Sequence, residues 1–305
     1  MHTVLIITNT IDLTVDYLID KYSDQVQFFR LNTDRFQDYD IHITSEETFI
    51  EYQDKSSSLL LSECDALYYR KISMPSLDEY PSRYRQMMQR EMMTVIEGIA
   101  ETAGHFALTR PSIIRKADNK VVQLSIAKKV GFTMPNSLIT NANQAAMSFS
   151  STAKSIVKPI SVGKIISSET VGFIQTNIVE EHTEITGLNN SPAYFQFYQS
   201  KDYEVRLTIV NSELFGVRID SSDKIDWRKE SAQLKYSKIE IPSAIAEKCL
   251  KMMWHLGLQF AAFDFIVSQG DYYFLELNAN GQWLWLEEEL DLGIAEMIIH
   301  TLRKG

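Results

Sequence analysis

The sequence is poor in several features that mark specialised classes of protein. Its 305 residues contain only two cysteines, Cys64 and Cys249, far apart and without His or Cys neighbours at metal-site spacing. This argues against a disulfide scaffold or a zinc site and fits a reducing cytoplasm. No apolar run reaches about 18 residues, and the start MHTVLIITNT is too short an apolar stretch for a secretory signal. We therefore expect a cytoplasmic protein with no membrane partner.

Basic residues are also scarce relative to acidic ones. Thirty Lys and Arg stand against forty Asp and Glu, giving a formal net charge of −10, and no basic run interrupts the acidic background. Binding to the phosphates of a nucleic acid depends on clustered positive charge, so we expect no nucleic-acid partner.

The patterns that are present indicate an α/β protein with more than one domain. Residues 3–8 form a short β-branched run and residues 11–21 a helical pattern, an alternation typical of α/β layers. A long helix is predicted over roughly residues 81–103, and a second region begins near residue 110. No period of 20–50 residues repeats, which excludes solenoids and propellers.

The most informative segment is a predicted hairpin near the end of the chain, FAAFDFIVSQGDYYFLELN. Glu276 and Asn278 are two residues apart on its second strand, so they point to one face. Asp264 joins that face if it lies directly opposite Glu276, with Cβ atoms about 5 Å apart.

The turn of this hairpin decides whether the two carboxylates meet. Their pairing requires Ser268 opposite Tyr272, with residues 269–271 as a three-residue turn, a length that often uses glycine. In that register Tyr272 and Phe274 share the face of Glu276.

Two carboxylates and an amide oxygen on one face repel each other unless a hard cation lies between them. The alternative is that Asp264 and Glu276 are edge charges on separate faces. Both interrupt highly apolar strands, however, and charges so placed are rarely buried without a partner or a metal. The pattern D-x11-E-L-N therefore predicts a Mg²⁺ site made by Asp264, Glu276 and Asn278.

Four basic residues are candidates for binding phosphate. Lys158 lies inside the strand SIVKPI, and Lys120 stands at a predicted helix start, where a phosphate also gains backbone N–H groups. Each lysine alone is better explained as a solvated surface residue. Arg206 and Arg228 can match phosphate oxygens bidentately. A metal with several cations, and no Walker-A motif, indicates phosphoryl chemistry outside the P-loop class.

In their order along the chain, these segments resemble the ATP-grasp fold. The first nucleotide-domain helix is matched by RKADNKVVQLSIAKKVGFTMP and the phosphate-binding lysine strand by IVKP. The adenine hinge and the triphosphate arginine strand are matched by AYFQFYQSKDYEVRLTIV, and the metal hairpin by FDFIVSQGDYYFLELNANGQ. The resemblance implies an amino-terminal pre-ATP-grasp α/β domain (1–110), a central subdomain (111–192) and a carboxy-terminal antiparallel-sheet subdomain (193–305).

Within that superfamily, essentially the whole chain resembles the microviridin-type, or graspetide, peptide ligases. The matching segments are ALYYRKISMP, RPSIIRKADNK, QFYQSKDYEVRLTIV, the DWR of IDWRKE and above all ELNANGQWLWLE. Such enzymes bind a ribosomally made precursor peptide through its leader and phosphorylate a core Asp or Glu side chain with ATP. A Thr or Ser hydroxyl or a Lys amine then displaces phosphate and closes an ω-ester or ω-amide ring.

The resemblance assigns roles residue by residue, with ATP and Mg²⁺ as cofactors. Lys120 and Lys158 match the lysines on the ATP phosphates. The adenine-contacting hinge is matched by Gln196, Phe197 and Tyr198. Arg206 and Arg228 match arginines near the transferred phosphate. Asp264, Glu276 and Asn278 match the magnesium ligands.

Partner surfaces are less strongly indicated. Glu180, Glu181 and Glu184 could pair with an Arg of the leader, but a solvated charged loop explains them equally well. Methionines at positions 87, 88, 92 and 93 have helical spacing, which favours core packing over a homodimer contact. We nevertheless expect a homodimer.

Two other functions remain open on the sequence. The first is an ATP-grasp amino-acid or glutamate ligase acting on a small peptide or protein tail. The segment Ala-Asn-Gly-Gln-Trp after Asn278 stands where ribosomal-protein glutamate ligases often have Ser-Pro-Gly, which favours the peptide-cyclising branch. The second is a nucleotide-sensing or peptide-binding module with a dead site, and the intact metal and lysine set argues against it.

Overall fold

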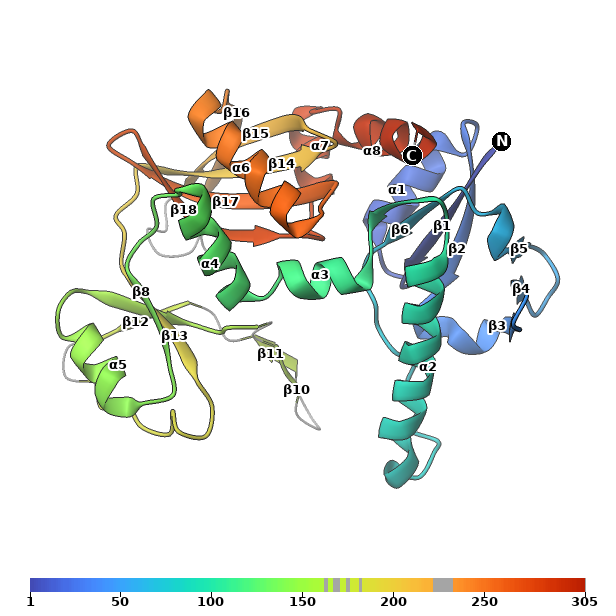
Figure 1. Cartoon of the computed structure of the whole chain (residues 1–305), viewed down its shortest axis with the longest axis horizontal. Coiled ribbons are helices and arrows are strands. Elements are labelled where there is room, and N and C mark those ends of the chain that lie inside the picture. Colours follow the sequence, from blue (N-terminus) through green and yellow to red (C-terminus); the bar gives the residue numbers. More distant parts are fainter. Residues whose placement is uncertain (162–163, 167–170, 174–175, 181–182, 222–232, 305) are drawn as a thin grey trace.

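The computed structural model describes residues 1–161, 164–166, 171–173, 176–180, 183–221 and 233–304. Figure 1 shows three bodies: an amino-terminal α/β body, a carboxy-terminal body beside it, and a smaller central body below the latter. This is the predicted α/β architecture. Among the described residues no helix is both long and apolar enough to cross a membrane.

The amino-terminal body is built on a parallel sheet of four strands in the order β2-β1-β6-β7. These are β1 (His2–Thr8), β2 (Val26–Asn32), β6 (Ala66–Tyr69) and β7 (Phe106–Thr109). The run VLII of β1 is fully buried, as expected for a strand covered on both faces. From β1 the chain goes to β2 on one side and later returns as β6 on the other. The carboxyl ends of β1 and β6 therefore flank the point where the strand order reverses.

Helices and a small antiparallel sheet complete this body. The helices are α1 (Leu13–Tyr22) and α2 (Ser82–Thr102), with short 3₁₀ turns η1 (Thr33–Asp38) and η2 (Leu61–Glu63). The small sheet contains β3 (Tyr39–Ile43), β4 (Thr48–Tyr52) and β5 (Ser58–Leu60).

The long helix predicted over residues 81–103 is confirmed as α2, but its methionines do not lie in the core as expected. Only the carboxy-terminal half of α2 is anchored in the core, through Ile96, Ile99 and Ala100. The other half projects from the body in Figure 1. None of the four methionines is buried, and Met87 is 55% exposed. The expectation of core packing was therefore wrong.

Two helices, α3 (Pro111–Ala117) and α4 (Lys120–Val130), lead into the central body. Helix α4 begins where it does because the Asn119 side chain accepts hydrogen bonds from the backbone N–H groups of Val121 and Val122. It ends at Gly131, whose φ of +83° favours glycine.

The central body contains an antiparallel sheet in the order β12-β9-β13-β8. Its strands are β8 (Ser137–Thr140), β9 (Ser155–Lys158), β12 (Asn177–Val179) and β13 (Ala193–Phe197). Helix α5 (Asn143–Ser150) packs on it through the buried Ala146. A further strand pair joins β10 (Lys164–Ile166) and β11 (Val171–Phe173).

The carboxy-terminal body has a five-stranded antiparallel sheet in the order β16-β15-β14-β17-β18. The strands are β14 (Tyr203–Val210), β15 (Glu213–Ser221), β16 (Leu234–Lys238), β17 (Phe260–Ser268) and β18 (Asp271–Asn278). One face packs against α4 and α6 (Ser243–Leu256), forming an apolar core. The opposite face carries the polar residues of the site.

The last two helices, α7 (Leu284–Leu290) and α8 (Ile294–Lys304), connect the two large bodies. Ile298 and Leu302 of α8 share one core with Val4 and Ile6 of β1. Trp283, fully buried, belongs to that core as well. The end of the chain thus packs onto the sheet formed by its beginning.

Candidate active site

The hairpin of β17 and β18 confirms the predicted pairing of Asp264 with Glu276, but by a different turn. Gln269 and Gly270, with φ of 52° and 86°, form a two-residue turn, and Ser268 pairs with Asp271. Positive φ at both central positions matches the twist of paired strands. Asp264 pairs with Glu276, but the next residue, Phe265, pairs with Phe274. The extra residue of β18 between these two pairs forms a β-bulge. The predicted three-residue turn was wrong.

The bulge also changes which side chains share a face. Phe274 now points into the apolar core and stacks on Phe132, with ring centroids 4.9 Å apart, and Tyr272 lies in the same core. Glu276 lies on the opposite face because a bulge shifts the alternation of the strand by one residue. The expectation that Tyr272 and Phe274 share the face of Glu276 was therefore wrong.

On the polar face, the predicted ligands are held in one hydrogen-bonded group. Arg206 of β14 lies opposite Asp264 of β17 and donates from Nη1 to both oxygens of its carboxylate at 2.8 Å. The Asn278 amide donates to Asp264 Oδ2 at 3.2 Å and to Glu276 Oε1 at 3.5 Å. Lys120 Nζ lies 2.6 Å from Glu276 Oε2. The structure thus brings together five of the residues singled out from the sequence.

Helix α4 is clamped to the hairpin by a glutamine that sequence reasoning missed. The buried Gln123 donates to the carbonyl oxygen of Leu277 at 2.7 Å and accepts from its N–H at 3.1 Å. These two hydrogen bonds hold the start of α4, and with it Lys120, next to Glu276. A large polar residue between apolar neighbours in VVQL was the available signal.

The carboxylate of Asp118 completes this corner of the site. It accepts the backbone N–H of Ala279 at 3.2 Å, just beyond the hairpin. Partial desolvation by the surrounding protein raises the pKa of Asp118 above its ordinary value, although the residue is still exposed at the surface.

The predicted nucleotide residues gather on the central sheet. Lys158 Nζ donates to Gln196 Oε1 at 3.2 Å and lies 4.5 Å from the ring centroid of Tyr194. Gln196 in turn donates to Ser137 Oγ at 3.0 Å. Burial raises the pKa of Tyr194, and the negative charge of Glu276 raises it further, which links this group electrostatically to the hairpin.

The rest of the predicted hinge lies alongside. The Phe197 ring stacks on Phe149 of α5, with centroids 4.5 Å apart. Tyr198 donates its N–H to the carbonyl oxygen of Lys154 at 2.8 Å, and Lys154 Nζ lies 4.7 Å from the Tyr198 ring centroid.

Some predicted residues lie elsewhere or outside the described ranges. Arg228 and Glu181 fall within the residues that the structure does not describe. Glu180 and Glu184 are both exposed, and neither is among the residues that line the pocket over the hairpin.

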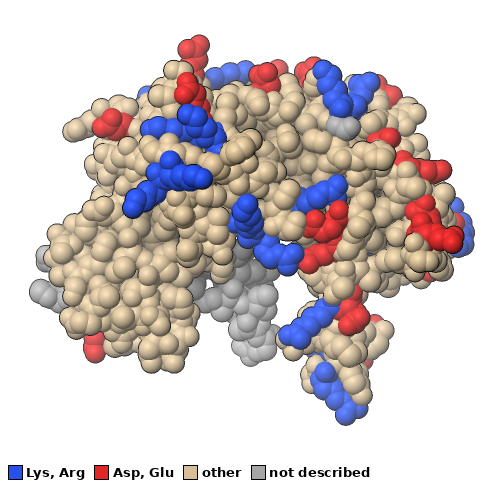
Figure 2. All heavy atoms as spheres, in the orientation of Figure 1, with Lys and Arg blue, Asp and Glu red and all other residues tan. Residues whose placement is uncertain are grey.

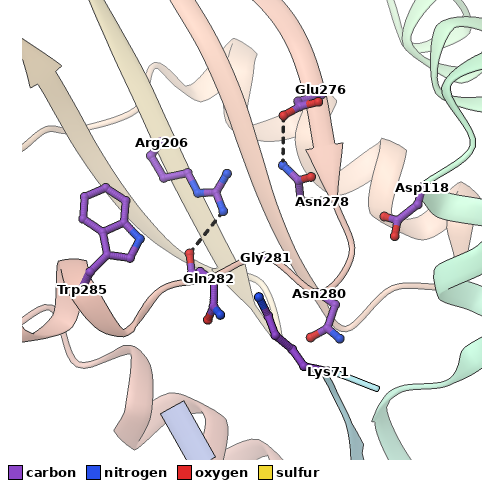
Figure 3. Close-up of a pocket in the computed structure, with 9 residues that line it drawn as sticks. All are labelled: Lys71, Asp118, Arg206, Glu276, Asn278, Asn280, Gly281, Gln282 and Trp285. Atoms are coloured by element: carbon purple, nitrogen blue, oxygen red, sulfur yellow. Dashed lines mark hydrogen bonds between the residues drawn. The ribbon is translucent and has the colours of Figure 1, made fainter. Parts of the chain in front are cut away.

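A pocket of about 400 Å³ opens over the polar face of the hairpin. Figure 3 shows the side chains that surround it. The lining residues are Lys71, Asp118, Arg206, Glu276, Asn278, Asn280, Gly281, Gln282 and Trp285. The pocket thus combines both bodies, because Lys71 comes from the amino-terminal one.

The segment after the hairpin forms one wall of the pocket and passes close to Arg206. A Cβ at Gly281 would lie 2.6 Å from the Ala262 Cβ and 2.7 Å from Arg206 Nη2, so only glycine fits here. Arg206 Nη2 also donates to the Gln282 carbonyl oxygen at 3.2 Å. Arg206 Nε is buried and has no hydrogen-bond partner in the described part of the chain.

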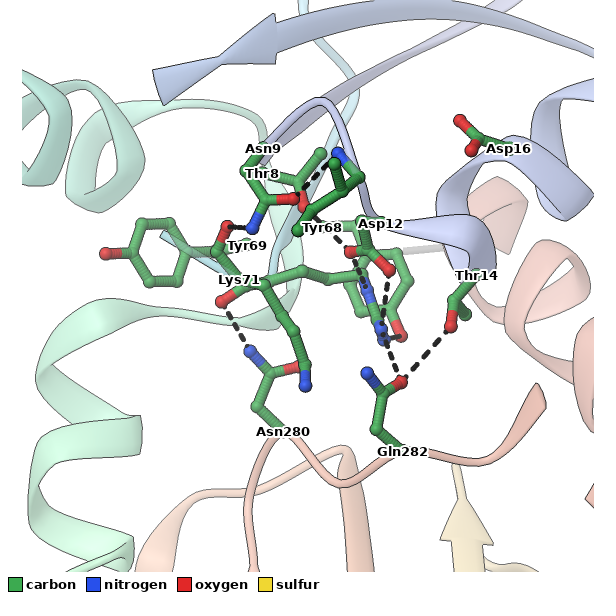
Figure 4. A network of polar contacts seen from close by, with 12 residues as sticks. Thr8, Asn9, Asp12, Thr14, Asp16, Tyr68, Tyr69, Lys71, Asn280 and Gln282 are labelled. Carbon is green, nitrogen blue, oxygen red and sulfur yellow. Dashed lines mark hydrogen bonds and ion pairs between the residues drawn. The ribbon is translucent and has the colours of Figure 1, made fainter. Parts of the chain in front are cut away.

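The amino-terminal body holds this segment through a buried ion pair. Arg70 donates to Asp12 at 2.8 and 3.2 Å and to the Tyr68 hydroxyl at 2.8 Å. The same guanidinium donates to Gln282 Oε1 at 3.1 Å, and Asn280 donates to the Arg70 carbonyl oxygen at 2.6 Å. Figure 4 shows Asp12, Gln282 and Asn280 converging from the two bodies.

The Asp12 carboxylate keeps its charge inside this network. Burial alone would raise its pKa, but the hydrogen bond and positive charge of Arg70 outweigh burial and leave the pKa below its ordinary value.

The donor set of the hairpin suits a hard cation. No group of three or more His, Cys, Asp or Glu in the described residues could hold a metal, and the predicted set needs the amide of Asn278 as its third member. Asp264, Glu276 and the Asn278 amide oxygen are all oxygen donors, which Mg²⁺ prefers. The amide now presents its NH₂ group to the carboxylates, so a half-turn about its last bond would present the oxygen.

Fold and site together define an ATP-grasp protein, which is a nucleotide-binding protein. The chain belongs to the RimK-like ATP-grasp family, whose domain model matches residues 117–302. A model described as the MvdD pre-ATP grasp domain matches residues 3–115. The chain is thus an ATP-grasp ligase with a pre-ATP-grasp domain, and the predicted resemblance is confirmed.

Solved structures of similar fold cover nearly the whole chain. One is a RiPP-associated ATP-grasp ligase of Chryseobacterium gregarium in complex with ADP and a leader and core peptide, with 27% identity, a TM-score of 0.88, and coverage of 99% of this chain and 97% of that chain. Another is the macrocyclase MdnC of Microcystis aeruginosa MRC bound with precursor peptide MdnA, with 26% identity, a TM-score of 0.88, and coverage of 99% and 100%.

One relative with sequence similarity is named for a different activity from that of the macrocyclase. The glutamate–LysW ligase ArgX of Sulfolobus acidocaldarius is 23% identical over 215 residues, which are 68% of this chain and 76% of that protein.

Proposed function

We propose that the chain is an ATP-dependent ligase that cyclises a ribosomally made precursor peptide. It activates Asp or Glu side chains as acyl phosphates and joins them to Thr or Ser hydroxyls as ω-esters, or to Lys amines as ω-amides. The observation that carries this proposal is the pocket, in which oxygen ligands, Arg206 and a wall from the pre-ATP-grasp domain surround one space. The precursor-bound and peptide-bound relatives support it.

ATP lies along the central sheet in this proposal. Lys158 and Lys120 bind its phosphates, and the hinge formed by Gln196, Phe197 and Tyr198 contacts adenine. The contact of Lys158 with Gln196 supports this placement, because it joins the phosphate and adenine ends of one site. Lys120, at the start of α4, adds the N–H groups of the first helical turn.

Asp264, Glu276 and Asn278 would hold Mg²⁺. A cation held by these three residues would supply positive charge against the phosphates of ATP. The two carboxylates are now paired with Arg206 and Lys120, which would then be available for phosphate oxygens.

The chemistry needs phosphate as a leaving group because a free carboxylate repels nucleophiles and cannot release oxide. Arg206 and Arg228 hold the acyl phosphate while it is attacked, and such a donor contributes about 3–4 kcal/mol to transition-state stabilisation. The peptide supplies both reacting groups, so proximity favours ring closure.

The partner surfaces are part of the proposal. The exposed Glu180 and Glu184, with Glu181 between them, bind a basic residue of the leader. The projecting half of α2, with Tyr84 and Met87 exposed, favours contact with a second copy, giving a homodimer. The cytoplasm is the proposed location, since both cysteines are free.

A second candidate is a ligase that adds an amino acid or glutamate to a peptide or protein tail. The similarity to the glutamate–LysW ligase favours it.

One experiment separates the two candidates. The chain is incubated with ATP, Mg²⁺ and a synthetic peptide encoded beside its gene, and the product is examined by mass spectrometry. Cyclisation removes one water per ring, whereas aminoacylation in the presence of free amino acids adds a residue mass. A peptide of unchanged mass, with no ADP formed, contradicts both.

A further inference from the structure

One wall of the pocket carries a cation from the amino-terminal body. Lys71 lines the pocket together with Arg206, Glu276 and Asn278 but lies on the amino-terminal body. In Figure 3 its amine end points toward Gly281, while Glu276 and Asn278 lie at the far side of the view. The hairpin and the amino-terminal body therefore face each other across the pocket.

The position of Lys71 follows from the topology of the first sheet. Ligands of open parallel sheets bind outside the carboxyl ends of the strands, where the strand order reverses. Here that point lies between β1, which ends at Thr8, and β6, which is followed directly by Arg70 and Lys71. The pocket reaches this crevice, so a residue of the pre-ATP-grasp domain is placed where a ligand is expected.

The backbone on both sides of Lys71 is held. Asn9 donates from Nδ2 to the Lys71 carbonyl oxygen at 3.0 Å. Asn280 donates to the carbonyl oxygen of the preceding Arg70 at 2.6 Å. Figure 4 shows Asn9 and Asn280 on either side of Lys71. The base of the lysine side chain is thus fixed relative to the pocket.

Neighbouring cations have opposite environments here. The Arg70 side chain is fully buried and paired with Asp12. Lys71 Nζ forms no hydrogen bond or ion pair with any residue that the structure describes, although the side chain is only partly exposed. Burial, and to a lesser extent the positive charge of Arg70, lower the pKa of Lys71, and the negative charge of Asp12 offsets only part of this.

Two of the other charged groups around the pocket are held in ion pairs, while Asp118 accepts a backbone N–H. Arg206 is paired with Asp264, and Glu276 with Lys120. Of the two cations in the described lining, Lys71 is therefore the one that forms no ion pair with a described residue. Lys158 and Gln196, which are proposed to bind the nucleotide, are not among the described lining residues, whereas Lys71 is. An anion bound at Lys71 would lie across the pocket from Glu276 and Asn278.

We propose that Lys71 binds the acceptor Asp or Glu carboxylate of the peptide and remains paired with it after phosphorylation. The pre-ATP-grasp domain then contributes a catalytic residue, not only a surface for the neighbouring segment. This inference rests on the proposed function and adds the residue that recognises the reacting group.

The two chemical steps balance with Lys71 protonated throughout. A carboxylate oxygen attacks the γ-phosphorus of ATP, the new O–P bond forms, and the bond from that phosphorus to the β–γ bridging oxygen breaks, releasing ADP. The hydroxyl or amine then attacks the carbonyl carbon, inorganic phosphate leaves with the C–O bond electrons, and the nucleophile's proton passes to phosphate. The ammonium stays on the other carboxyl oxygen, where negative charge develops during attack.

The test compares Lys71→Met, Lys71→Arg and, as a control, Lys129→Met on the exposed end of α4. Turnover is measured at saturating ATP with the synthetic peptide described above, and Mg·ADP affinity by calorimetry. Lys71→Met should lower turnover about 100-fold with unchanged Mg·ADP affinity. Lys71→Arg should recover a clear part of the loss, and the control should match the unaltered chain.

Each contrary outcome has its own meaning. Unchanged turnover in Lys71→Met, with the original chain active, overturns the role of Lys71 and leaves the proposed function intact. Equal losses of turnover and Mg·ADP affinity place the lysine on the nucleotide and also overturn it. Failure of the original chain to make ADP or change the peptide contradicts the proposed function, and the acceptor role with it. A thermal midpoint equal to that of the control excludes misfolding.

Discussion

Two buried arginine–carboxylate pairs lie close together in this molecule and differ in what surrounds them. Arg70 and Asp12 have side chains 0% and 1% exposed, and Thr8 and Tyr68 add hydrogen bonds around them. The pair is enclosed on all sides by the amino-terminal body and the segment after the hairpin.

Arg206 and Asp264 are a little more accessible, at 8% and 9%, and their pair borders the pocket. The Arg206 Nε atom lacks a hydrogen-bond partner in the described part of the chain, and the Asn278 amide can reverse its donors and acceptors. The first pair is thus closed and holds the bodies together. The second borders open space, where under the proposed function a metal and a phosphate would replace its present partners.

The largest expected effect is a loss of stability when the closed pair of Arg70 and Asp12 is broken. Asp12→Asn leaves the buried Arg70 charge without its carboxylate, which costs about 3–5 kcal/mol of the free energy of unfolding. Chemical denaturation measures it. Asp264→Asn should cost clearly less, since Arg206 there faces the pocket. Equal losses would break the distinction between the two pairs.

Substitutions at the open site should affect activity more than stability. Glu276→Gln removes the charge of one proposed Mg²⁺ ligand and should lower peptide-dependent ADP formation about 10²–10³-fold. Its unfolding free energy should change little, because Glu276 and its partner Lys120 are both partly exposed. Glu288→Gln, on the exposed side of α7, is the matched control and should leave ADP formation unchanged. Full activity in Glu276→Gln would refute the metal site.

The link between the two pairs can be tested through Gln282. Its side chain accepts from Arg70 at 3.1 Å and from Thr14 at 3.2 Å, while its carbonyl oxygen accepts from Arg206. Gln282→Ala removes the first two bonds and should cost about 1–3 kcal/mol of the free energy of unfolding. Turnover should fall as well, since the same segment covers Arg206. Lost stability with unchanged turnover would show that the pairs act independently.

The smallest effect concerns pH. The folded-state pKa of Asp12 is below its ordinary value of 3.8, so its contribution to stability is present above that value and lost as pH falls through the folded pKa. The stability difference between the original chain and Asp12→Asn should be constant from neutral pH to about pH 5 and shrink below about pH 4. Denaturation curves between pH 3 and 7 measure it. A difference that grows on acidification would contradict the sign.

Much of the site could be predicted from sequence because its residues stand in short, strongly patterned segments. The two-residue spacing of Glu276 and Asn278 on an apolar strand placed them on one face, and the pairing with Asp264 follows. The bulge could not be predicted, since its cost is balanced by core packing of Phe274 that no local pattern shows. The roles assigned to the site residues and the divisions at 110/111 and 192/193 remain predictions.

The contribution of the amino-terminal body could not be predicted for a different reason. Arg70 and Lys71 are adjacent cations in the sequence, and nothing local says that one turns inward to Asp12 while the other enters the pocket. That depends on contacts more than 200 residues apart, such as Asn280 with Arg70. Such long-range pairings leave no periodic signal.

The core shared by β1 and α8 has a consequence for engineering. A chimera that exchanges the pre-ATP-grasp domain at its sequence boundary would expose Trp283 to a foreign surface and leave Gln282 without Arg70. Residues 279–304 would have to travel with residues 1–109 as one inherited unit. The natural way to recombine two such ligases is therefore not a single cut but a pair of cuts, one after residue 109 and one before residue 279.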